Sequence, residues 1–156
     1  MKTLVAYYSR TGNTRRVGQE IAKKLEADIE EIKPVRNRST ISTYIVGSFK
    51  SFLKKPEEIK ATAKDARTYD LVIIGSPIWG GYMTGMMRSY IQQNSEKFKK
   101  VAFYVTCGGA SSQKSLDDMG EAIGGKPEAT LAVREKDLAK GEHIKLIKEF
   151  TDKLKE

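Results

Sequence analysis

The sequence predicts an α/β fold: a doubly wound, five-stranded parallel sheet of order 2-1-3-4-5 with helices on both faces. Short apolar runs alternate with amphipathic stretches, which is typical of a parallel sheet covered by helices. Two runs, 3–8 and 70–75, are mostly apolar, as in strands that are buried on both faces. In such a sheet, built with right-handed crossovers, the ligand site is expected beyond the carboxyl ends of the first and third strands.

The first predicted elements are a strand, a helix and a second strand. Residues 3–8 form the first strand, and the helix covers about 13–26. Residues 27–35 are predicted as the second strand, in which Ile29 and Ile32 are the apolar side chains. The apolar side chains of the helix recur every fourth residue on one face, and they are Val17, Ile21 and Leu25.

The connection to the third strand, residues 36–68, is predicted to hold two helices. Ser39 and Thr40 can each cap the first of them. A short helix around 57–66 then completes the crossover. The first helix has an apolar stripe of Ile41, Ile45, Phe49 and Phe52, with Tyr44 and Leu53 beside it.

The second half of the chain continues the alternation. Its predicted elements are strands at 70–75, 100–106 and 129–133 and helices at 84–94, 112–123 and 138–155. The last helix carries its apolar side on Ile144, Ile147, Phe150, Thr151 and Leu154. No repeat, low-complexity tract or linker divides the chain, so we expect 1–156 to form a single domain.

The composition excludes several classes of protein. The chain has 156 residues, of which 39% are hydrophobic and 31% charged, as in ordinary globular domains. No apolar run approaches the ~18–20 residues that cross a bilayer, and no signal-peptide pattern opens the sequence, so we expect no membrane span and a cytoplasmic location. The one cysteine and one histidine exclude a disulfide framework, a cysteine-based zinc cluster and a His-rich metal site, so no metal is expected.

The loop after the first strand leads directly into a helix, and it is rich in small polar residues. The free N–H groups and the dipole of a helix N-terminus favour an anion there, and hydroxyl donors add to this effect. The pattern suits a phosphate monoester, and the alternative is an ordinary N-cap. It is neither G-x-G-x-x-G nor a P-loop, and it holds no cysteine nucleophile. The loop consists of Ser9, Arg10, Thr11, Gly12, Asn13 and Thr14.

With this loop after an apolar first strand, the chain resembles the flavodoxin family, and the resemblance extends over its order of strands and helices. The resemblance implies a flavodoxin-like fold and FMN as a non-covalently bound cofactor, with the phosphate in the loop at 9–14. It also implies that two further loops, at 76–83 and 106–112, hold the isoalloxazine ring.

The loop at 76–83 contains the one tryptophan of the chain. A flat aromatic side chain in a Gly/Pro-rich loop suits stacking on a planar ring, and the alternative is that Trp79 packs the loop onto the core. By resemblance, Trp79 stacks on the flavin and the Gly80 carbonyl turns toward flavin N5, which favours the protonated one-electron-reduced flavin. Many electron-carrying flavodoxins have acidic residues after this glycine, whereas this chain has Gly81, Tyr82 and Met83 there. Without that negative charge near the ring, we expect the potential of the second reduction step of the flavin to be less negative than in the acidic carriers. The candidate binding residues are Pro77, Ile78, Trp79, Gly80 and Gly81.

The third loop supplies Thr106, Cys107, Gly108 and Gly109 as candidate binding residues. By resemblance it surrounds the pyrimidine edge of the flavin. A second aromatic is missing from it, so Tyr82 is a candidate for covering the other ring face. Cys107 is either a small buried residue, as free cysteines usually are, or a redox thiol. His143 lies far along the sequence from these loops, and we expect it to be a surface or packing residue.

Two functions follow from the resemblance, an electron carrier and a reductase. The electron carrier needs no catalytic side chain. The favoured one is an electron carrier that shuttles electrons between redox partners, and the alternative is an NAD(P)H-dependent FMN or quinone reductase. The net charge of +8 predicts anionic partners, and no nucleic-acid-binding module is present, so nucleic acid is not expected. The segment 33–60 is basic, and three interpretations are open: a helix with a solvated outer face, a docking site for an acidic redox partner, or a helix that lies on a membrane surface. Its basic residues are Lys33, Arg36, Arg38, Lys50, Lys54, Lys55 and Lys60.

Overall fold

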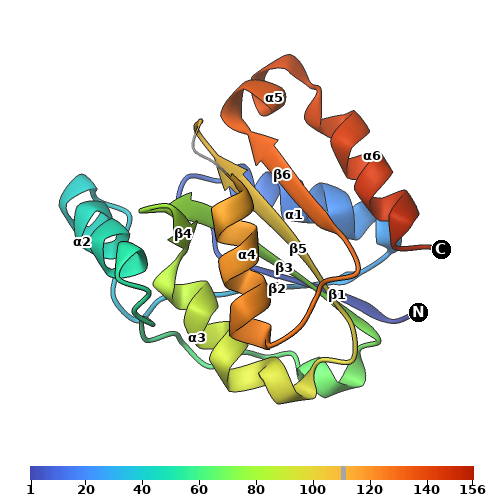
Figure 1. Ribbon diagram of the computed structural model, residues 1–156, viewed down its shortest axis with the longest axis horizontal. Coiled ribbons are helices and arrows are strands. Elements are labelled where there is room, and N and C mark those ends of the chain that lie inside the picture. The colour runs from blue at the N-terminus through green and yellow to red at the C-terminus, as the bar shows by residue number, and fades with distance from the viewer. Residues whose placement is uncertain (110–111) are drawn as a thin grey trace.

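The five parallel strands lie in the predicted order, and a further short strand pairs with the end of the third one (Figure 1). The computed structural model describes residues 1–109 and 112–156. The sheet runs β2-β1-β3-β5-β6, and β4 pairs antiparallel with β3. The strands are β1 (Thr3–Tyr7), β2 (Asp28–Glu31), β3 (Leu71–Trp79), β4 (Tyr82–Met83), β5 (Val101–Cys107) and β6 (Thr130–Arg134). The helices are α1 (Asn13–Leu25), α2 (Ile41–Phe52), α3 (Gly85–Asn94), α4 (Ser112–Ile123), α5 (Glu135–Lys140) and α6 (His143–Lys153), with 3-10 turns η1 (Ala66–Thr68) and η2 (Ser95–Lys97).

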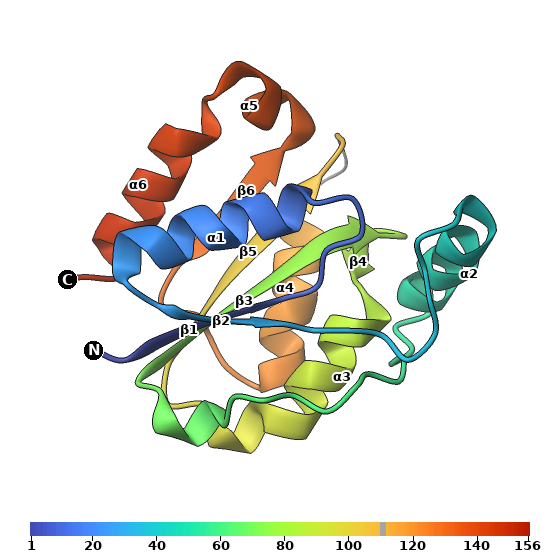
Figure 2. The same cartoon turned by 180° about the vertical axis from the view of Figure 1, so that it is seen from behind.

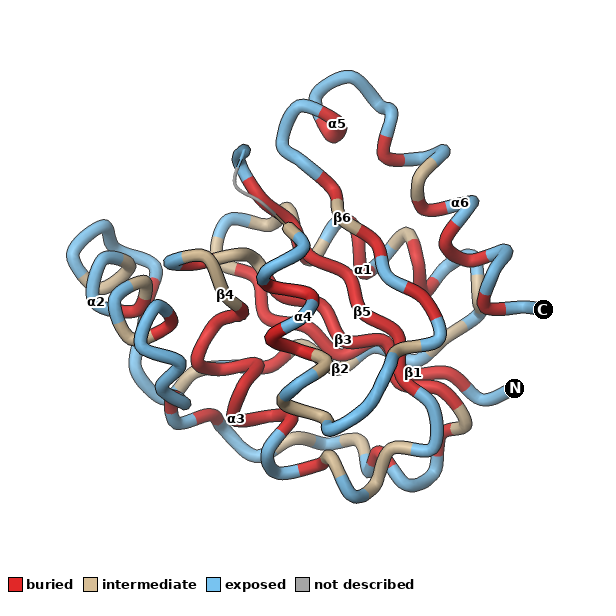
Figure 3. Tube along the Cα trace, viewed as in Figure 1, coloured by how far each residue is buried: buried red, intermediate tan, exposed pale blue. Residues whose placement is uncertain are grey.

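Helices cover both faces of the sheet, which confirms the predicted fold class. In Figure 1 α3 and α4 lie in front of the sheet, and Figure 2 shows α1 and α6 on the opposite face. Successive side chains of β1 point to opposite faces, so Leu4 joins the core under α3 and α4, whereas Val5 joins the core under α1 and α6. The central strands β1, β3 and β5 are buried along most or all of their length (Figure 3), as both cores require, whereas the edge strand β2 has no buried residue.

Close packing fixes α1 on its face of the sheet. A Cβ at Gly18 would lie 2.5 Å from Tyr104 Oη and 2.7 Å from Tyr7 Cδ1, so two tyrosine rings occupy the space that a larger residue would need. The Tyr104 hydroxyl donates to the Thr14 carbonyl at 3.0 Å. Burial raises the pKa of Tyr104 well above its ordinary value, which keeps the hydroxyl a donor. The start of α1 is therefore tied to β5.

The loop predicted at 76–83 is instead the end of β3, a two-residue turn and β4, so that part of the prediction was wrong. Trp79 pairs with Tyr82 across the turn. Gly80 and Gly81 have φ of +57° and +89°. Positive φ at both central residues is the mark of a type I′ turn, whose twist matches that of the two strands, and glycine adopts it without strain.

Three other elements differ from the prediction. No helix forms at 57–66, because the backbone of 58–60 pairs with 33–35: Val35 N donates to the Glu58 carbonyl at 3.1 Å, and Lys60 N to the Lys33 carbonyl at 2.8 Å. The second strand is shorter than the predicted 27–35. The last predicted helix is divided into α5 and α6 at Gly141, whose φ of +75° ends α5.

Helix α2 forms where it was predicted, and it directs its apolar stripe away from the core. Thr40 caps it, as proposed, by accepting from Thr43 N at 3.4 Å. Its apolar stripe points to solvent: Ile41 is 74% exposed and Phe49 62%. In Figures 1 and 2 the helix lies beside β4, beyond the body of the sheet. Within the part of the chain that the structure describes, no helix is both long and apolar enough to cross a membrane.

Candidate functional site

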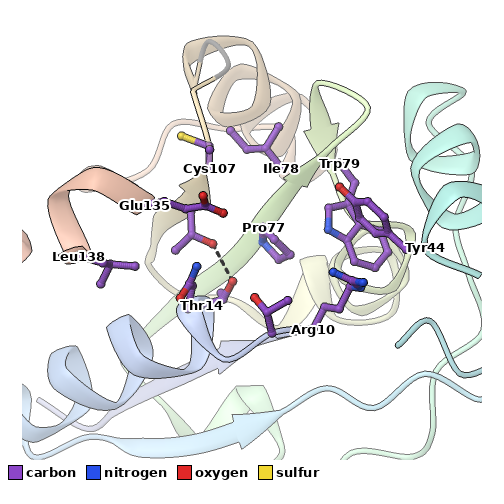
Figure 4. Close-up of a pocket in the computed structure, with 13 residues that line it drawn as sticks. Arg10, Thr14, Tyr44, Pro77, Ile78, Trp79, Cys107, Glu135 and Leu138 are labelled. Atoms are coloured by element: carbon purple, nitrogen blue, oxygen red, sulfur yellow. Dashed lines mark hydrogen bonds between the residues drawn. The ribbon is translucent and has the colours of Figure 1, made fainter. Parts of the chain in front are cut away.

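A cavity of about 230 Å³ opens at the carboxyl ends of β1, β3 and β5. This position is the topological switch point, where ligands of open α/β sheets bind. Figure 4 shows side chains from all three predicted loops directed into one space. The lining consists of Arg10, Thr11, Asn13, Thr14, Tyr44, Pro77, Ile78, Trp79, Thr106, Cys107, Gly108, Glu135 and Leu138.

The loop between β1 and α1 leaves the helix N-terminus open. Gly12 is the N-cap residue, with φ +105°, and no side chain of the described residues caps the helix. Ser9 Oγ instead accepts from Gly12 N at 3.1 Å, and this bond joins the two ends of the turn that precedes the helix. Ser9 itself does not line the cavity. The ordinary N-cap that the sequence allowed is therefore not what this loop forms. Its first-turn N–H groups remain free to bind an anion.

A hydroxyl pair joins two of the loops at the centre of the cavity. Thr14 Oγ1 and Thr106 Oγ1 lie 2.7 Å apart, and both residues are buried (Figure 4). Only one of the two protons is used between them, so the other hydroxyl proton is available to a ligand. This contact couples the first turn of α1 to the end of β5.

Arg10 brings a positive charge to the cavity. Its guanidinium lies over the Tyr44 ring, 4.4 Å from the centroid, and Nη2 donates to the Ser39 carbonyl at 3.4 Å. The Nε atom is buried and has no hydrogen-bond partner among the described residues. A buried donor without a partner is costly, and an anionic ligand would satisfy it.

The apolar wall of the cavity comes from the end of β3. Pro77 and Ile78 are partly exposed in it, but Trp79 is only 3% exposed. The indole is held edge to face by Tyr8 and Tyr44, with ring centroids 5.4 and 5.0 Å away. Trp79 thus packs the end of β3 onto the core, which was the alternative reading of this residue, while one side of it still reaches the cavity.

The opposite wall contains the third loop. Cys107 and Gly108 line the cavity, whereas Ala110 and Ser111 of the predicted loop lie outside the described residues. Burial raises the pKa of the Cys107 thiol, which favours the neutral form and agrees with a small buried residue.

Three lining residues were missed by the sequence analysis. Glu135 and Leu138 lie on α5, and Tyr44 lies on α2. The Asp137 carboxylate accepts from Arg134 N at 2.8 Å, which fixes the start of α5; this bond lowers the pKa of Asp137. The position of Glu135 at the carboxyl end of a parallel strand could have suggested it, but nothing in the sequence marked Tyr44.

Some predicted site residues lie beside the cavity rather than in it. Two ammonium groups lie near the Tyr82 ring, with Lys54 Nζ 4.7 Å and Lys114 Nζ 4.4 Å from its centroid, and Tyr82 does not line the cavity. His143 is fully buried and packs between α5 and α1, near the Asp137 carbonyl and Glu20. The predicted binding residues outside the lining are Ser9, Gly12, Gly80, Gly81 and Gly109.

The fold and the cavity together define a doubly wound α/β protein with an anion-binding loop at its switch point. The chain belongs to the flavodoxin family: the family model described as Flavodoxin matches residues 2–145.

Solved structures of flavoproteins share this architecture. A flavoprotein from Lactobacillus acidophilus NCFM, solved in complex with FMN, is 23% identical with a TM-score of 0.72, and the match covers 89% of this chain and 97% of that one. The flavodoxin from Streptococcus pneumonia TIGR4 is 16% identical with a TM-score of 0.61, and the match covers 99% of this chain and 97% of that one. At these identities the likeness supports the fold.

One curated relative carries an enzyme name. It is an NAD(P)H dehydrogenase (quinone) from Archaeoglobus fulgidus, 29% identical over 94 residues. The match covers 58% of this chain and 49% of the relative, so the chain spans about half the length of that protein where the two align.

Proposed function

We propose that the chain binds FMN non-covalently in this cavity, as one domain, and transfers electrons through it between redox partners. The observation that carries the proposal is the anion site: the cavity is lined by the loop that holds both an uncapped helix N-terminus and the buried, unpartnered Nε of Arg10. Both features favour a phosphate group, and the family and the FMN-bound structural relative support the same cofactor.

The residues present fit the different parts of this cofactor. The N–H groups that open α1 and the Arg10 guanidinium would hold the phosphate. The Thr14–Thr106 hydroxyl pair and the Glu135 carboxylate offer a donor and an acceptor to the ribityl hydroxyls. Pro77 and Ile78 offer an apolar surface to the ring. FMN, when bound, supplies the exchange of electrons in single or paired steps.

The volume of the cavity indicates how much of the flavin it can enclose. Its volume of about 230 Å³ is below the roughly 300–1,000 Å³ of pockets that enclose most of a drug-sized ligand. Part of the cofactor would therefore extend past the rim, where a partner can reach it. An exposed ring edge is what an electron carrier needs, because it exchanges electrons without enclosing a substrate.

The charges near the hairpin favour easy full reduction of the cofactor. Lys114 Nζ lies 4.4 Å from the Tyr82 ring centroid and would lie 3.7 Å from a Cβ at Gly81, whereas Lys54 is paired with Asp118 at 3.6 Å. Positive charge stabilises an anionic, fully reduced ring if that ring lies nearby. We therefore retain the prediction of a less negative second potential than in acidic carriers, and a redox titration of the loaded protein measures it.

The second candidate function is an NAD(P)H-dependent quinone or FMN reductase, and the quinone dehydrogenase relative is the observation that favours it. Anaerobic mixing of the loaded protein with NADPH separates the two functions. A carrier is bleached only after a reductase is added, whereas a reductase is bleached directly. A cytoplasmic location belongs to the same proposal, and cell fractionation tests it.

The phosphate site is tested by comparing FMN with riboflavin, which lacks the phosphate. Arg10→Gln should weaken FMN binding by about tenfold, because a charge-assisted contact is lost, and should leave riboflavin binding nearly unchanged. Arg67→Gln is the matched control, since the Arg67 side chain is 69% exposed on η1, outside the cavity lining. Equal loss for both ligands, or no loss for either, would show that Arg10 does not bind the phosphate.

A further inference from the structure

The outer face of α2 is a continuous apolar surface exposed to solvent. Phe49 and Phe52 are 62% and 55% exposed, and the helix stands apart from the body of the molecule in Figures 1 and 3. Exposed apolar patches of this kind mark interaction sites. We call this surface the α2 face, and it consists of Ile41, Ile45, Val46, Phe49, Phe52 and Leu53.

The inner face of the helix makes this orientation the stable one. Gly47 and Ser51 are buried there, and a Cβ at Gly47 would lie 2.9 Å from the Trp79 ring. The turn at Gly80 is equally close, since a Cβ there would lie 2.5 Å from the Ser48 carbonyl. Only small side chains fit between α2 and the hairpin, so a rotation that buried Phe49 or Phe52 would produce clashes.

The charge around the α2 face is uniformly positive along the chain. Residues 32–56 contain six Lys and Arg and no Asp or Glu. Arg38 is neutralised by its buried ion pair with Glu57, and Lys54 lies 3.6 Å from Asp118, whereas Lys55 is exposed just beyond the helix. An occupant of this face must therefore combine apolar material with negative charge.

This chemistry favours one occupant over the others. A second copy would bring another chain of net charge +8 and the same lysines against this face, which opposes association. A protein partner would need an apolar groove shaped to a projecting helix. An anionic bilayer surface needs no such shape, because its acyl chains adapt to the side chains while its headgroups attract the lysines.

We propose that the α2 face docks on the surface of a membrane that carries anionic lipids. The helix lies in the plane of the interface, with Phe49 and Phe52 at the boundary between headgroups and acyl chains and Lys55 among the headgroups. Tyr44, on another side of the same helix, lines the cavity, so docking brings the cavity close to the bilayer.

Sedimentation of the FMN-saturated protein with lipid vesicles tests this proposal. We expect at least about tenfold stronger partition onto vesicles of phosphatidylcholine with phosphatidylglycerol than onto phosphatidylcholine alone, weakened by salt. The double change Phe49→Ser with Phe52→Ser should reduce partition by about a hundredfold, and Lys55→Glu by about tenfold.

Two control variants match these changes at the other end of the molecule. Ile144→Ser removes an apolar side chain that is 56% exposed, and Lys153→Glu makes the same charge reversal on α6; both should partition as the unchanged protein does. Circular dichroism and FMN affinity are measured on every variant, so that a failure of cofactor binding is distinguished from a failure of docking.

Three results would overturn the proposal. One is no partition onto the anionic vesicles, and another is partition that survives the loss of Phe49 and Phe52. The third is self-association in sedimentation velocity that the same double change abolishes, without vesicle binding, because the occupant would then be a second copy of this chain.

Discussion

Helices α1 and α2 carry apolar stripes of the same period, yet they use them in opposite ways. In α1, Val17 and Ile21 are fully buried against the sheet. In α2, Ile41 and Ile45 are 74% and 61% exposed. The comparison teaches that a helical period identifies a stripe but does not determine whether the stripe meets the core.

The surface available beneath each helix explains the difference. Helix α1 lies across β1 and β3, whose apolar side chains form one of the two cores. Helix α2 lies past the end of the sheet, over the β3–β4 hairpin, where the ion pair of Arg38 and Glu57 is buried. Beneath α2 the apolar contact among the described residues centres on Trp79, which meets Tyr44 and Gly47, and no row of apolar strand side chains faces the stripe.

The largest effect that follows from this comparison concerns the polar anchor of α2. Arg38 Nε donates to Glu57 Oε1 at 2.9 Å, and both side chains are 5% exposed. Arg38→Met should lower the free energy of unfolding by about 4 kcal/mol, because it leaves a buried carboxylate without its main partner. Urea denaturation followed by circular dichroism measures the loss.

The double variant Arg38→Met with Glu57→Met controls for the shape of this site. It removes both charges, so it should recover most of the stability that the single change loses. If the single change is as stable as the unchanged protein, α2 is not held by this ion pair, and the contrast between the two helices needs another explanation.

The apolar anchor of α1 is expected to contribute somewhat less per residue. Ile21 is fully buried in the core between α1 and the sheet. Ile21→Ala should lower the free energy of unfolding by about 3 kcal/mol, from lost burial and the cavity left behind. The same urea titration measures it, and a loss below about 1 kcal/mol would mean that α1 is not anchored as its packing indicates.

The sequence was sufficient for the sheet and its covering helices because the signals there are local. Buried strands such as β1 and β5 read as apolar runs, and α1 has its stripe facing a surface that the same fold provides. The sequence predicts a loop rather than a hairpin at Gly80 and Gly81, because the strand after the turn, β4, has only two residues and leaves no strand pattern. The bend of 58–60 toward 33–35 depends on contacts between distant segments, which no local pattern records.

Local sequence signals also predicted part of the candidate site. Arg10, Thr14 and Cys107 were identified because they follow strands whose carboxyl ends meet at the switch point. The depth of Trp79 is not predictable from the sequence, because the placement of Tyr44 and Gly47 on α2 decides how deeply the indole is buried. Tyr44 itself enters the cavity only because α2 turns its stripe outward, and that orientation is a tertiary property.

The smallest effect is the one that completes the comparison. Ile45→Ala makes the same chemical change as Ile21→Ala, in the other helix, at a side chain that solvent already surrounds. It should therefore change the free energy of unfolding by no more than about 0.5 kcal/mol, since surface substitutions remove little buried area. The two variants are measured side by side by urea denaturation, with Ile144→Ala on α6 as a second exposed control. A loss at Ile45 close to that at Ile21 would mean that the α2 face is covered in the free protein, and both the contrast between the helices and the membrane proposal would then fail together.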